Sequence, residues 1–221
     1  MDPRDYIIIG AGSAGSVLAN RLSAGDATVC VLEAGPRDLN PMIHIPAGFM
    51  KTLTDKRVNW LFQSEPSEGT AGRRIHAPRG KVLGGSSSIN GHVYNRGPST
   101  DFNTWAQMGN RGWSYADVLP YFKRSENRVG GDDKNYHGRD GELAVTDIDA
   151  HDPVCDAFID GVANMGIPRN PDYNGATHAG VGYFQRTIKN GRRMSAAVSF
   201  LNPARHRKNL DIRTGAHVER I

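Results

Sequence analysis

Residues 6–35 read YIIIGAGSAGSVLANRLSAGDATVCVLEAG, and they hold the clearest indication of the fold. It begins with a continuous apolar run, residues 6–9, which is typical of a buried parallel strand and stops at Gly10. In residues 14–22 the apolar positions recur at the three- and four-residue spacing of a helix. Residues 28–32 form another short apolar run and predict a second buried strand. Strand, glycine turn, helix and strand predict a βαβ unit, the beginning of a doubly wound α/β fold of Rossmann type.

The turn between the first strand and the helix, residues 10–15, is Gly-Ala-Gly-Ser-Ala-Gly. This is G-x-G-x-x-G directly after a strand and at the start of a helix, the context that separates a dinucleotide-binding loop from a chance match. Gly10 permits the tight turn, Gly12 lets the backbone approach a pyrophosphate, and Gly15 lets the helix pack on the strand. The helix N-terminus presents free amides to that anion. The alternative, that the glycines only form a turn, is disfavoured by the strand and helix on either side.

Glu33 ends the second predicted strand, eighteen residues after Gly15. A carboxylate at this place accepts hydrogen bonds from ribose hydroxyls. It also argues against NADP, because it would face a 2′-phosphate of like charge. The loop and Glu33 together do not distinguish NAD from FAD.

A second glycine-serine loop, GKVLGGSSSIN at residues 80–90, follows about fifty residues later. A simple nicotinamide-binding domain has no need of it, whereas a longer cofactor does. The whole run 80–103 resembles the first signature of the glucose-methanol-choline family of FAD-dependent oxidoreductases, with no departing position. Further stretches that resemble this family are residues 32–35, 59–60, 78–81, 115–122 and 191–196, so the resemblance covers nearly the entire chain.

The resemblance implies an extended FAD, with its ADP end on the first glycine loop and its isoalloxazine ring against the second. The cofactor-binding residues expected on this basis are Gly10, Gly12, Ser13, Ala14, Gly15, Glu33, Ala34, Trp60, Val82, Gly84, Gly85, Asn90, Gly91, His92, Val93 and Val218. At Val82 and Val218 only the backbone is expected to contact FAD, and Trp60 fits a core aromatic equally well. Some members bind FAD covalently through a histidine at the position of Ile89, so the resemblance implies non-covalent FAD.

The resemblance further implies oxidation of an alcohol, a CH–OH donor, by hydride transfer to flavin N5, in a choline-dehydrogenase-like enzyme. The reduced flavin then passes electrons to oxygen or another acceptor. Members of the family are more than twice as long, and their catalytic histidine lies beyond residue 221. No catalytic residue is therefore expected in this chain; His92, inside the second loop, is a weak candidate, and a histidine that is simply hydrogen-bonded in place is the commoner outcome. The expected partner is the C-terminal remainder of the same enzyme, as a continuous or separate chain.

Two alternatives stay open at this point. Some family members are hydroxynitrile lyases that keep FAD on the same fold, and the chain also fits a flavin-binding module without activity. The remaining histidines show no metal-ligand spacing, so no metal site is expected. No G-x-S-x-G elbow is present, which disfavours serine hydrolysis.

Composition and charge argue against several other classes of function. Glycine makes up 26 of the 221 residues, which points to turns and close backbone approach. The net charge of +4 comes from residues 186–221, which hold nine Lys/Arg against two Asp/Glu. These cations lie among apolar residues without an aromatic platform, so nucleic-acid binding is not expected. Cys30 and Cys155 predict free thiols in a reducing compartment, with the cytoplasm as the default, and no apolar stretch is long enough to predict a membrane span.

The expected domains are residues 1–149, an FAD-binding domain with flavin-covering loops, residues 150–208, the first part of an α+β substrate-binding domain, and residues 209–221, a return strand of the FAD-binding domain. The capping box at residues 114–117 predicts a helix from Tyr115. Asp152-Pro153 predicts another helix that stops at Gly166. The apolar positions expected to face a core along that helix are Val154, Phe158, Val162 and Met165. Strand pieces are predicted at residues 210–212 and 218–221, with the chain ending inside the second.

Overall fold

A computed structural model of the chain describes residues 3–131, 133–149 and 151–221. The chain divides into two compact units. The first unit consists of residues 1–92 and 190–221, and the second unit consists of residues 93–189. The sequence predicts functional domains with boundaries after residues 149 and 208. This division stays a prediction, because the two compact units describe packing and not function.

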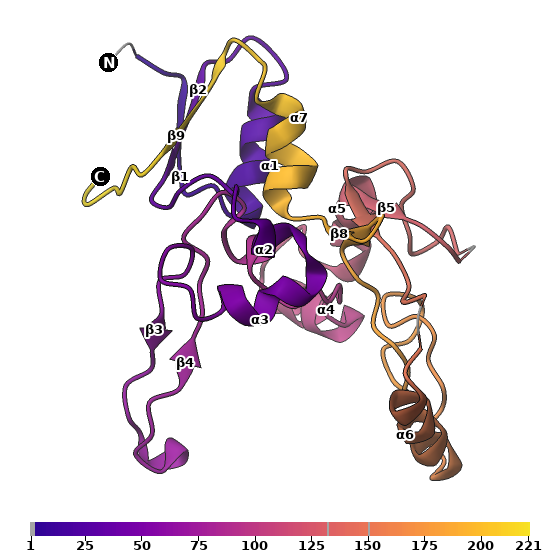
Figure 1. The fold of residues 1–221 in the computed structure, drawn as a ribbon. Helices are drawn as coiled ribbons and strands as arrows, with labels where there is room; N and C mark the ends of the chain where they lie inside the picture. Colours follow the sequence, from indigo (N-terminus) through magenta and orange to yellow (C-terminus); the bar gives the residue numbers. More distant parts are fainter. Residues whose placement is uncertain (1–2, 132, 150) are drawn as a thin grey trace. The chain divides into compact units, whose positions relative to one another are not determined.

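The first unit contains a three-stranded parallel sheet with the strand order β1-β2-β9 (Figure 1). Its strands are β1 (Tyr6–Ile9), β2 (Val29–Glu33) and β9 (Leu210–Thr214). Val29 pairs with Tyr6 on one side and with Leu210 on the other, so the strands start at one level. Their carboxyl ends therefore share one edge, where ligands bind in open α/β sheets. The strands predicted from residues 6–9, 28–32 and 210–212 are confirmed.

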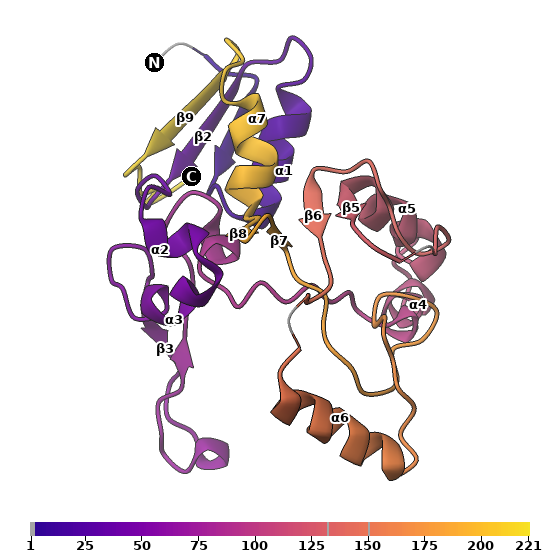
Figure 2. The ribbon, with the colours of Figure 1, turned by 45° about the vertical axis from the view of Figure 1, so that its right-hand side comes forward.

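Two helical segments pack on one face of this sheet (Figure 2). They are α1 (Ser13–Leu22) and a π-helical segment, η4 (Ala197–Leu201), which continues into α7 (Asn202–Ala204). The Asn20 side-chain amide donates to the Phe200 carbonyl oxygen at 2.7 Å and ties the two segments together. The helix predicted after the glycine loop is thereby confirmed.

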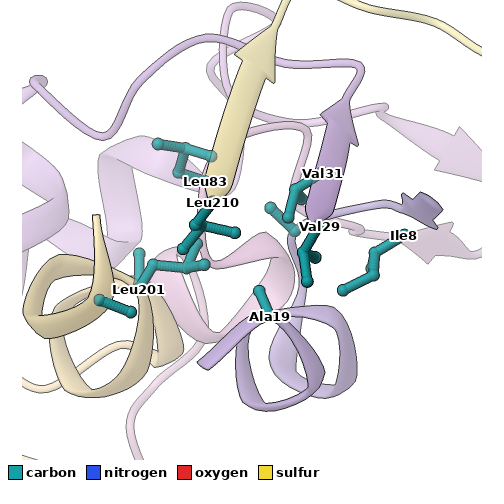
Figure 3. Packing of buried hydrophobic residues seen from close by; sticks show 10 residues of the cluster. Ile8, Ala19, Val29, Val31, Leu83, Leu201 and Leu210 are labelled. Atoms are coloured by element: carbon teal, nitrogen blue, oxygen red, sulfur yellow. The ribbon is translucent and has the colours of Figure 1, made fainter. Parts of the chain in front are cut away.

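The core of the first unit lies between the sheet and these helices. Figure 3 shows Val29 and Val31 of β2 above Ala19 of α1, with Leu210 of β9 and Leu201 of η4 to their left. Burying a valine or leucine side chain contributes about 1.5–3 kcal/mol, so this cluster holds the segments together. Ala19 is small enough to let α1 approach the sheet closely.

One prediction about β1 is wrong. Ile7 and Ile9, on the face away from the helices, are exposed, Ile7 to 63%. Ile8 is the buried residue of this strand, and Tyr6 at its start is exposed as well. A strand buried on both faces was expected. In the described part of the chain, helices cover one face only, so the apolar residues of β1 that point the other way have nothing against them.

Residues 36–92 form short elements joined by extended loops, as the glycine- and proline-rich sequence predicts. The elements are α2 (Pro41–His44), η1 (Pro46–Gly48), α3 (Phe49–Thr52), β3 (Phe62–Gln63), η2 (Glu68–Thr70), β4 (His76–Ala77) and η3 (Gly85–Ser88), and the later segment β8 (Arg192–Arg193) belongs to the same unit. Ile43, Val58, Val82 and Ile89 form a second apolar cluster among them. This cluster anchors the second glycine-serine loop.

The second unit contains α4 (Ser99–Gln107), α5 (Tyr115–Ser125), β5 (Glu126–Arg128), β6 (Leu143–Val145), α6 (Pro153–Asn164) and β7 (Ile188–Lys189). The capping box at the start of α5 is confirmed, since Ser114 and Asp117 each bond the other's backbone amide. Asp152 caps α6 by accepting from the Val154 amide at 2.8 Å. Both helix starts were predicted correctly because capping is a local, side-chain-to-backbone interaction.

Two further predictions are wrong. The apolar side expected for α6 is exposed, with Val154 at 78% and Phe158 at 67%, and the buried residue is Ile159. Helical spacing predicts that an apolar stripe exists, but whether anything covers it depends on other segments. Residues 218–221 form no strand, because the chain leaves the sheet after Thr214. No helix in the described residues is long and apolar enough to cross a membrane.

Candidate functional site

A cavity of about 510 Å³ opens at the carboxyl edge of the sheet in the first unit. Four separate stretches contribute to its lining, together with one aromatic side chain from an intervening loop. The lining residues of these stretches are 9–10 and 12–13, 32–34, 79–80 and 85–86, and 216–218. The predicted cofactor-binding residues among its lining are Gly10, Gly12, Ser13, Glu33, Ala34, Trp60, Gly85 and Val218. Larger cavities of about 750 and 660 Å³ lie in the second unit, but none of the predicted residues lines them.

The three glycines of the first loop have distinct roles. Gly10 adopts φ +90°, a conformation that other residues rarely take, and its amide donates to the Leu32 carbonyl at 2.8 Å. A Cβ on Gly15 would lie 2.0 Å from the Gly10 carbonyl oxygen, so only glycine fits there. A Cβ on Gly12 would meet nothing closer than the Gly85 Cα at 4.0 Å. Gly10 and Gly15 therefore shape the turn, whereas Gly12 leaves open space beside the cavity.

The first turn of α1 offers backbone donors next to this space. Gly12 is the N-cap and supplies no side-chain cap, and the first turn holds no acidic side chain. The first amides of a helix have no partner within the helix, and its N-terminus carries a partial positive charge. Ser13 lines the cavity at this point. The arrangement suits an anion such as a phosphate group.

Glu33 is buried and lies between the two loops that follow β1 and β2. Its Oε2 accepts from the Ala11 amide at 2.8 Å, and its Oε1 accepts from the Gly35 amide at 2.9 Å. A carboxylate offers about four acceptor positions, so capacity remains on the cavity side for hydroxyl donors. Glu33 thus both fixes the glycine loop and presents acceptors to a ligand.

The second glycine-serine loop packs directly on the first. The Gly84 amide donates to the Ala11 carbonyl at 2.8 Å, and Gly84 has φ +88°. A Cβ on Gly85 would lie 2.7 Å from the Gly12 Cα. Glycine is therefore required in this loop for backbone-to-backbone contact with the first loop, a reason that the spacing of the motif alone does not disclose.

Trp60 forms one wall of the cavity rather than part of a core. Its ring stacks on Phe62 at 5.6 Å between centroids and meets His217 edge-on at 5.5 Å. The Lys81 Nζ lies 4.4 Å from the centre of the Trp60 ring, a cation–π contact. Trp60 lines the cavity and belongs to neither apolar cluster, which favours the ligand-facing interpretation over the core one.

Sequence reasoning did not select several lining residues. Arg79, Gly80, Ser86, Ala216 and His217 line the cavity as well. Arg79, Gly80 and Ser86 lie inside the motifs quoted above, and His217 is next to Val218, so closeness to a selected position could have identified these four. Ala216 is two residues from Val218. His217 in particular precedes Val218 and contacts Trp60.

The other predicted residues lie outside this cavity's lining: Ala14, Gly15, Val82, Gly84, Asn90, Gly91, His92 and Val93. The Val82 side chain is fully buried in the second apolar cluster. Ile89 lies in the same cluster. Val93 begins the second unit. The cofactor roles of these residues stay predictions.

His92 is held in place by its surroundings. Its Nε2 lies 3.1 Å from the Pro46 carbonyl oxygen, and its ring meets Phe49 edge-on at 5.9 Å. Its amide donates to Asn90 Oδ1 at 3.0 Å, and its φ of +49° is unusual for a residue with a side chain. These contacts favour a positioned histidine over a general base.

A buried group of charged residues lies in the second unit, and no motif or spacing in the sequence predicts it. Glu126, with 0% of its side chain exposed, accepts from Arg96 Nη2 at 2.7 Å and contacts His137 Nδ1 at 3.0 Å. The other ring nitrogen of His137 lies 2.8 Å from Asp172 Oδ2. Burial by itself lowers the pKa of His137, but the hydrogen bonds and charges of Asp172 and Glu126 more than offset it and raise the pKa to about 9. Two cations thus face two carboxylates, and the group is balanced internally.

A family model described as GMC oxidoreductase matches residues 4–221. An alcohol dehydrogenase [acceptor] of Pseudomonas putida is 48% identical over 218 residues, which are 98% of this chain and 40% of that protein. An oxygen-dependent choline dehydrogenase of Rhizobium rhizogenes is 49% identical over 209 residues, 94% of this chain and 38% of that protein. The chain spans about two fifths of the length of these curated relatives.

Solved structures show the same fold. Pyridoxine 4-oxidase from Mesorbium loti superposes with a TM-score of 0.90 at 38% identity, over 96% of this chain and 42% of that one. An FAD-dependent oxidoreductase from Chaetomium thermophilum gives a TM-score of 0.87 at 28% identity, over 96% and 38%.

Proposed function

The chain belongs to the GMC oxidoreductase family, and on this premise we propose that it forms most of the FAD-binding cradle of an enzyme that oxidises an alcohol. One observation carries the proposal. Four stretches far apart in the sequence, two of them glycine loops, converge on one cavity with an open helix N-terminus and a buried carboxylate.

The residues present fit the ADP half of FAD. The cavity, at about 510 Å³, lies within the usual range of small-molecule sites. The backbone at Gly12 and the first-turn amides of α1 would hold the pyrophosphate, and Glu33 would accept from ribose hydroxyls. Trp60 and residues 216–218 would border the adenine. Each role matches a donor or acceptor that the protein leaves available.

When bound, FAD supplies a ring that accepts a hydride at N5 from the alcohol carbon. The chain's own residues would bind and orient it. The first loop would hold the ADP half, and the second loop, which is fixed on the first through Gly84 and Gly85, would border the ring. A base must also take the hydroxyl proton. We assign it to the C-terminal remainder of the enzyme, because His92 is engaged with Pro46 and Phe49.

The names of the relatives support an alcohol as the donor and oxygen or another acceptor as the oxidant, since they are an alcohol dehydrogenase [acceptor] and oxygen-dependent choline dehydrogenases. We propose non-covalent FAD, because Ile89, at the position of covalent attachment in other members, is an apolar side chain buried in a cluster. Acid precipitation should then leave the yellow colour in the supernatant. We propose the cytoplasm as the location on the strength of the two free cysteines.

Titration of the purified chain with FAD, followed by flavin fluorescence, tests the cradle. Gly12→Val should weaken binding more than about 100-fold, because branched carbons would fill the space beside the first-turn amides and displace two charge-assisted hydrogen bonds. Gly25→Val is the matched control, since a Cβ there meets nothing within 4 Å and lies away from the cavity. Equal loss in both variants, or no FAD binding by the wild-type chain, would contradict the proposal.

Turnover tests the chemistry. The chain alone should not oxidise alcohols even with FAD, because the absence of a proton acceptor costs about 10²–10⁴-fold in rate and poor positioning costs more. Addition of the C-terminal remainder should restore activity. Alcohol oxidation by residues 1–221 alone, abolished by His92→Ala, would make His92 the base. Activity of the assembled pieces on a cyanohydrin but not on alcohols would favour the lyase alternative.

A further inference from the structure

Arg193, in β8 of the first unit, is the largest fully buried side chain in the described residues, with 1% of its surface exposed. Its guanidinium joins two parts of the unit. Nε donates to the Ile43 carbonyl oxygen at 2.8 Å, and Nη1 donates to the Ser87 carbonyl oxygen at 3.1 Å and to Asn90 Oδ1 at 2.8 Å. Arg193 thus holds the second glycine-serine loop from the side of the apolar cluster.

Among the residues that the structure describes, no carboxylate pairs with Arg193, and its Nη2 is buried without a hydrogen-bond partner. Burial lowers the pKa of Arg193 to about 10, which still leaves it charged at neutral pH. An unpaired buried charge costs several kcal/mol. The buried arginine of the second unit, Arg96, contrasts with it, because Glu126 pairs with Arg96 at 2.7 Å.

Hydrogen bonding to the loop does not by itself explain a cation here. The acceptors of Arg193 are two carbonyls and one side-chain amide oxygen, which a neutral donor also satisfies. The Ala196 amide already bonds Ser87 Oγ at 2.9 Å, so the same segment holds the loop by a second contact. A purely structural role therefore does not explain why this position carries a buried positive charge, which is energetically unfavourable.

The loop that Arg193 holds leads directly to the candidate site. Gly85 touches Gly12 of the first glycine loop, and Ser86 lines the cavity. FAD carries negative charge on its pyrophosphate in every state and on its ring after reduction. We infer that Arg193 is a positioning residue for the flavin loop and that its unpaired buried charge balances the negative charge of the bound flavin cofactor. This inference rests on the proposed function.

Three variants separate charge from hydrogen bonding. Arg193→Lys keeps the charge but cannot span the three acceptors, Arg193→Gln keeps a donor without charge, and Arg192→Gln is the matched control at the exposed neighbouring position. FAD affinity, ADP affinity, the flavin midpoint potential and the melting temperature of the FAD-free protein are measured for each. We expect Arg193→Gln to weaken FAD binding or lower the potential, Arg193→Lys to stay within about threefold of the wild-type affinity, and Arg192→Gln to change neither.

The same measurements give the size of the effect and show which part of FAD the charge acts on. Loss of an interaction with a charged group predicts that Arg193→Gln changes the affinity for the flavin by about 10- to 100-fold. If the charge acts on the pyrophosphate, ADP affinity falls in parallel with FAD affinity. If the charge acts on the reduced ring, ADP affinity is unchanged. The midpoint potential then falls by about 30 mV for each tenfold loss of affinity for the reduced flavin relative to the oxidised flavin.

Equal FAD affinities and potentials for the Lys and Gln variants, with equal losses of melting temperature, would overturn the inference and leave Arg193 a structural strap. Should Arg193→Gln not fold, Arg193→Lys decides, because a hydrogen-bonding role predicts that it loses FAD affinity as well. A wild-type chain that binds no FAD would instead defeat the proposed function, so the two failures are distinguishable.

Discussion

Two polar regions of this molecule are built from different kinds of chemical group. The region around Gly12 consists of backbone: two glycine loops in contact, a helix N-terminus without a cap, and one carboxylate that two amides hold. The region around Glu126 in the second unit consists of charged side chains, with Arg96 and His137 facing Glu126 and Asp172.

The two regions differ in what they leave unsatisfied. In the charged group of the second unit, the two cations pair with the two carboxylates. The group therefore needs no further ion to balance its charge. The glycine loops leave amides and carboxylate acceptors toward a cavity. Buried charges that pair with one another have a structural role. Hydrogen-bonding groups that have no protein partner and lie beside a cavity indicate a ligand.

The largest expected effect is on the charged group. Glu126→Gln should lower the free energy of unfolding by about 3–5 kcal/mol, because it leaves Arg96 and His137 buried without their shared carboxylate. Denaturant unfolding measures it. Glu65→Gln is the control, since Glu65 pairs with Arg74 at the surface, where such pairs contribute about 0–1 kcal/mol. A loss below 1 kcal/mol for Glu126→Gln would show that this region does not hold the fold.

Next in size is a pair of alanine variants in the first glycine loop. Gly15→Ala should cost about 3 kcal/mol, because its Cβ would lie 2.0 Å from the Gly10 carbonyl oxygen and the loop must shift. Gly12→Ala should cost about 1 kcal/mol or less, because its Cβ would have 4.0 Å of clearance. Thermal unfolding compares them, and equal costs would contradict the division of roles within the loop.

The smallest effect is a pH dependence confined to the second unit. The pKa of His137 is raised to about 9 from an ordinary value near 6.5, so its contribution to stability is complete below about pH 6.5 and is lost as the pH rises through 9. The pKa of Asp172 is lowered: burial raises it, but its hydrogen bonds with His137 and Gln185 outweigh burial, so Asp172 stays ionised throughout this range.

Urea midpoints at pH 6 and pH 9.5 should therefore fall with pH in the wild-type chain. In His137→Gln the decrease over this window should be smaller. A wild-type urea midpoint that rises from pH 6 to pH 9.5 would show that a charged His137 does not stabilise the fold. An equal fall of the midpoint in the variant would show the same.

The same comparison explains what the sequence could predict. The first region follows from local rules: glycines at fixed spacing, a strand before them, a helix after them and Glu33 at the end of the next strand. Arg96, Glu126, His137 and Asp172 share no spacing, so only the fold shows that they meet. The exposed apolar faces of β1 and α6 were missed for a related reason, since periodicity shows a stripe of apolar residues but not its cover.

Competition against bound FAD shows whether the cavity around Gly12 and Glu33 takes the ADP half of FAD. ADP and FMN are the competitors, and flavin fluorescence is the signal. ADP should displace FAD from the wild-type chain and fail to bind Gly12→Val, whereas FMN, which lacks the adenosine half, should displace FAD only weakly. Displacement by FMN with no effect of ADP would contradict the claim and place the main binding contacts away from the first glycine loop.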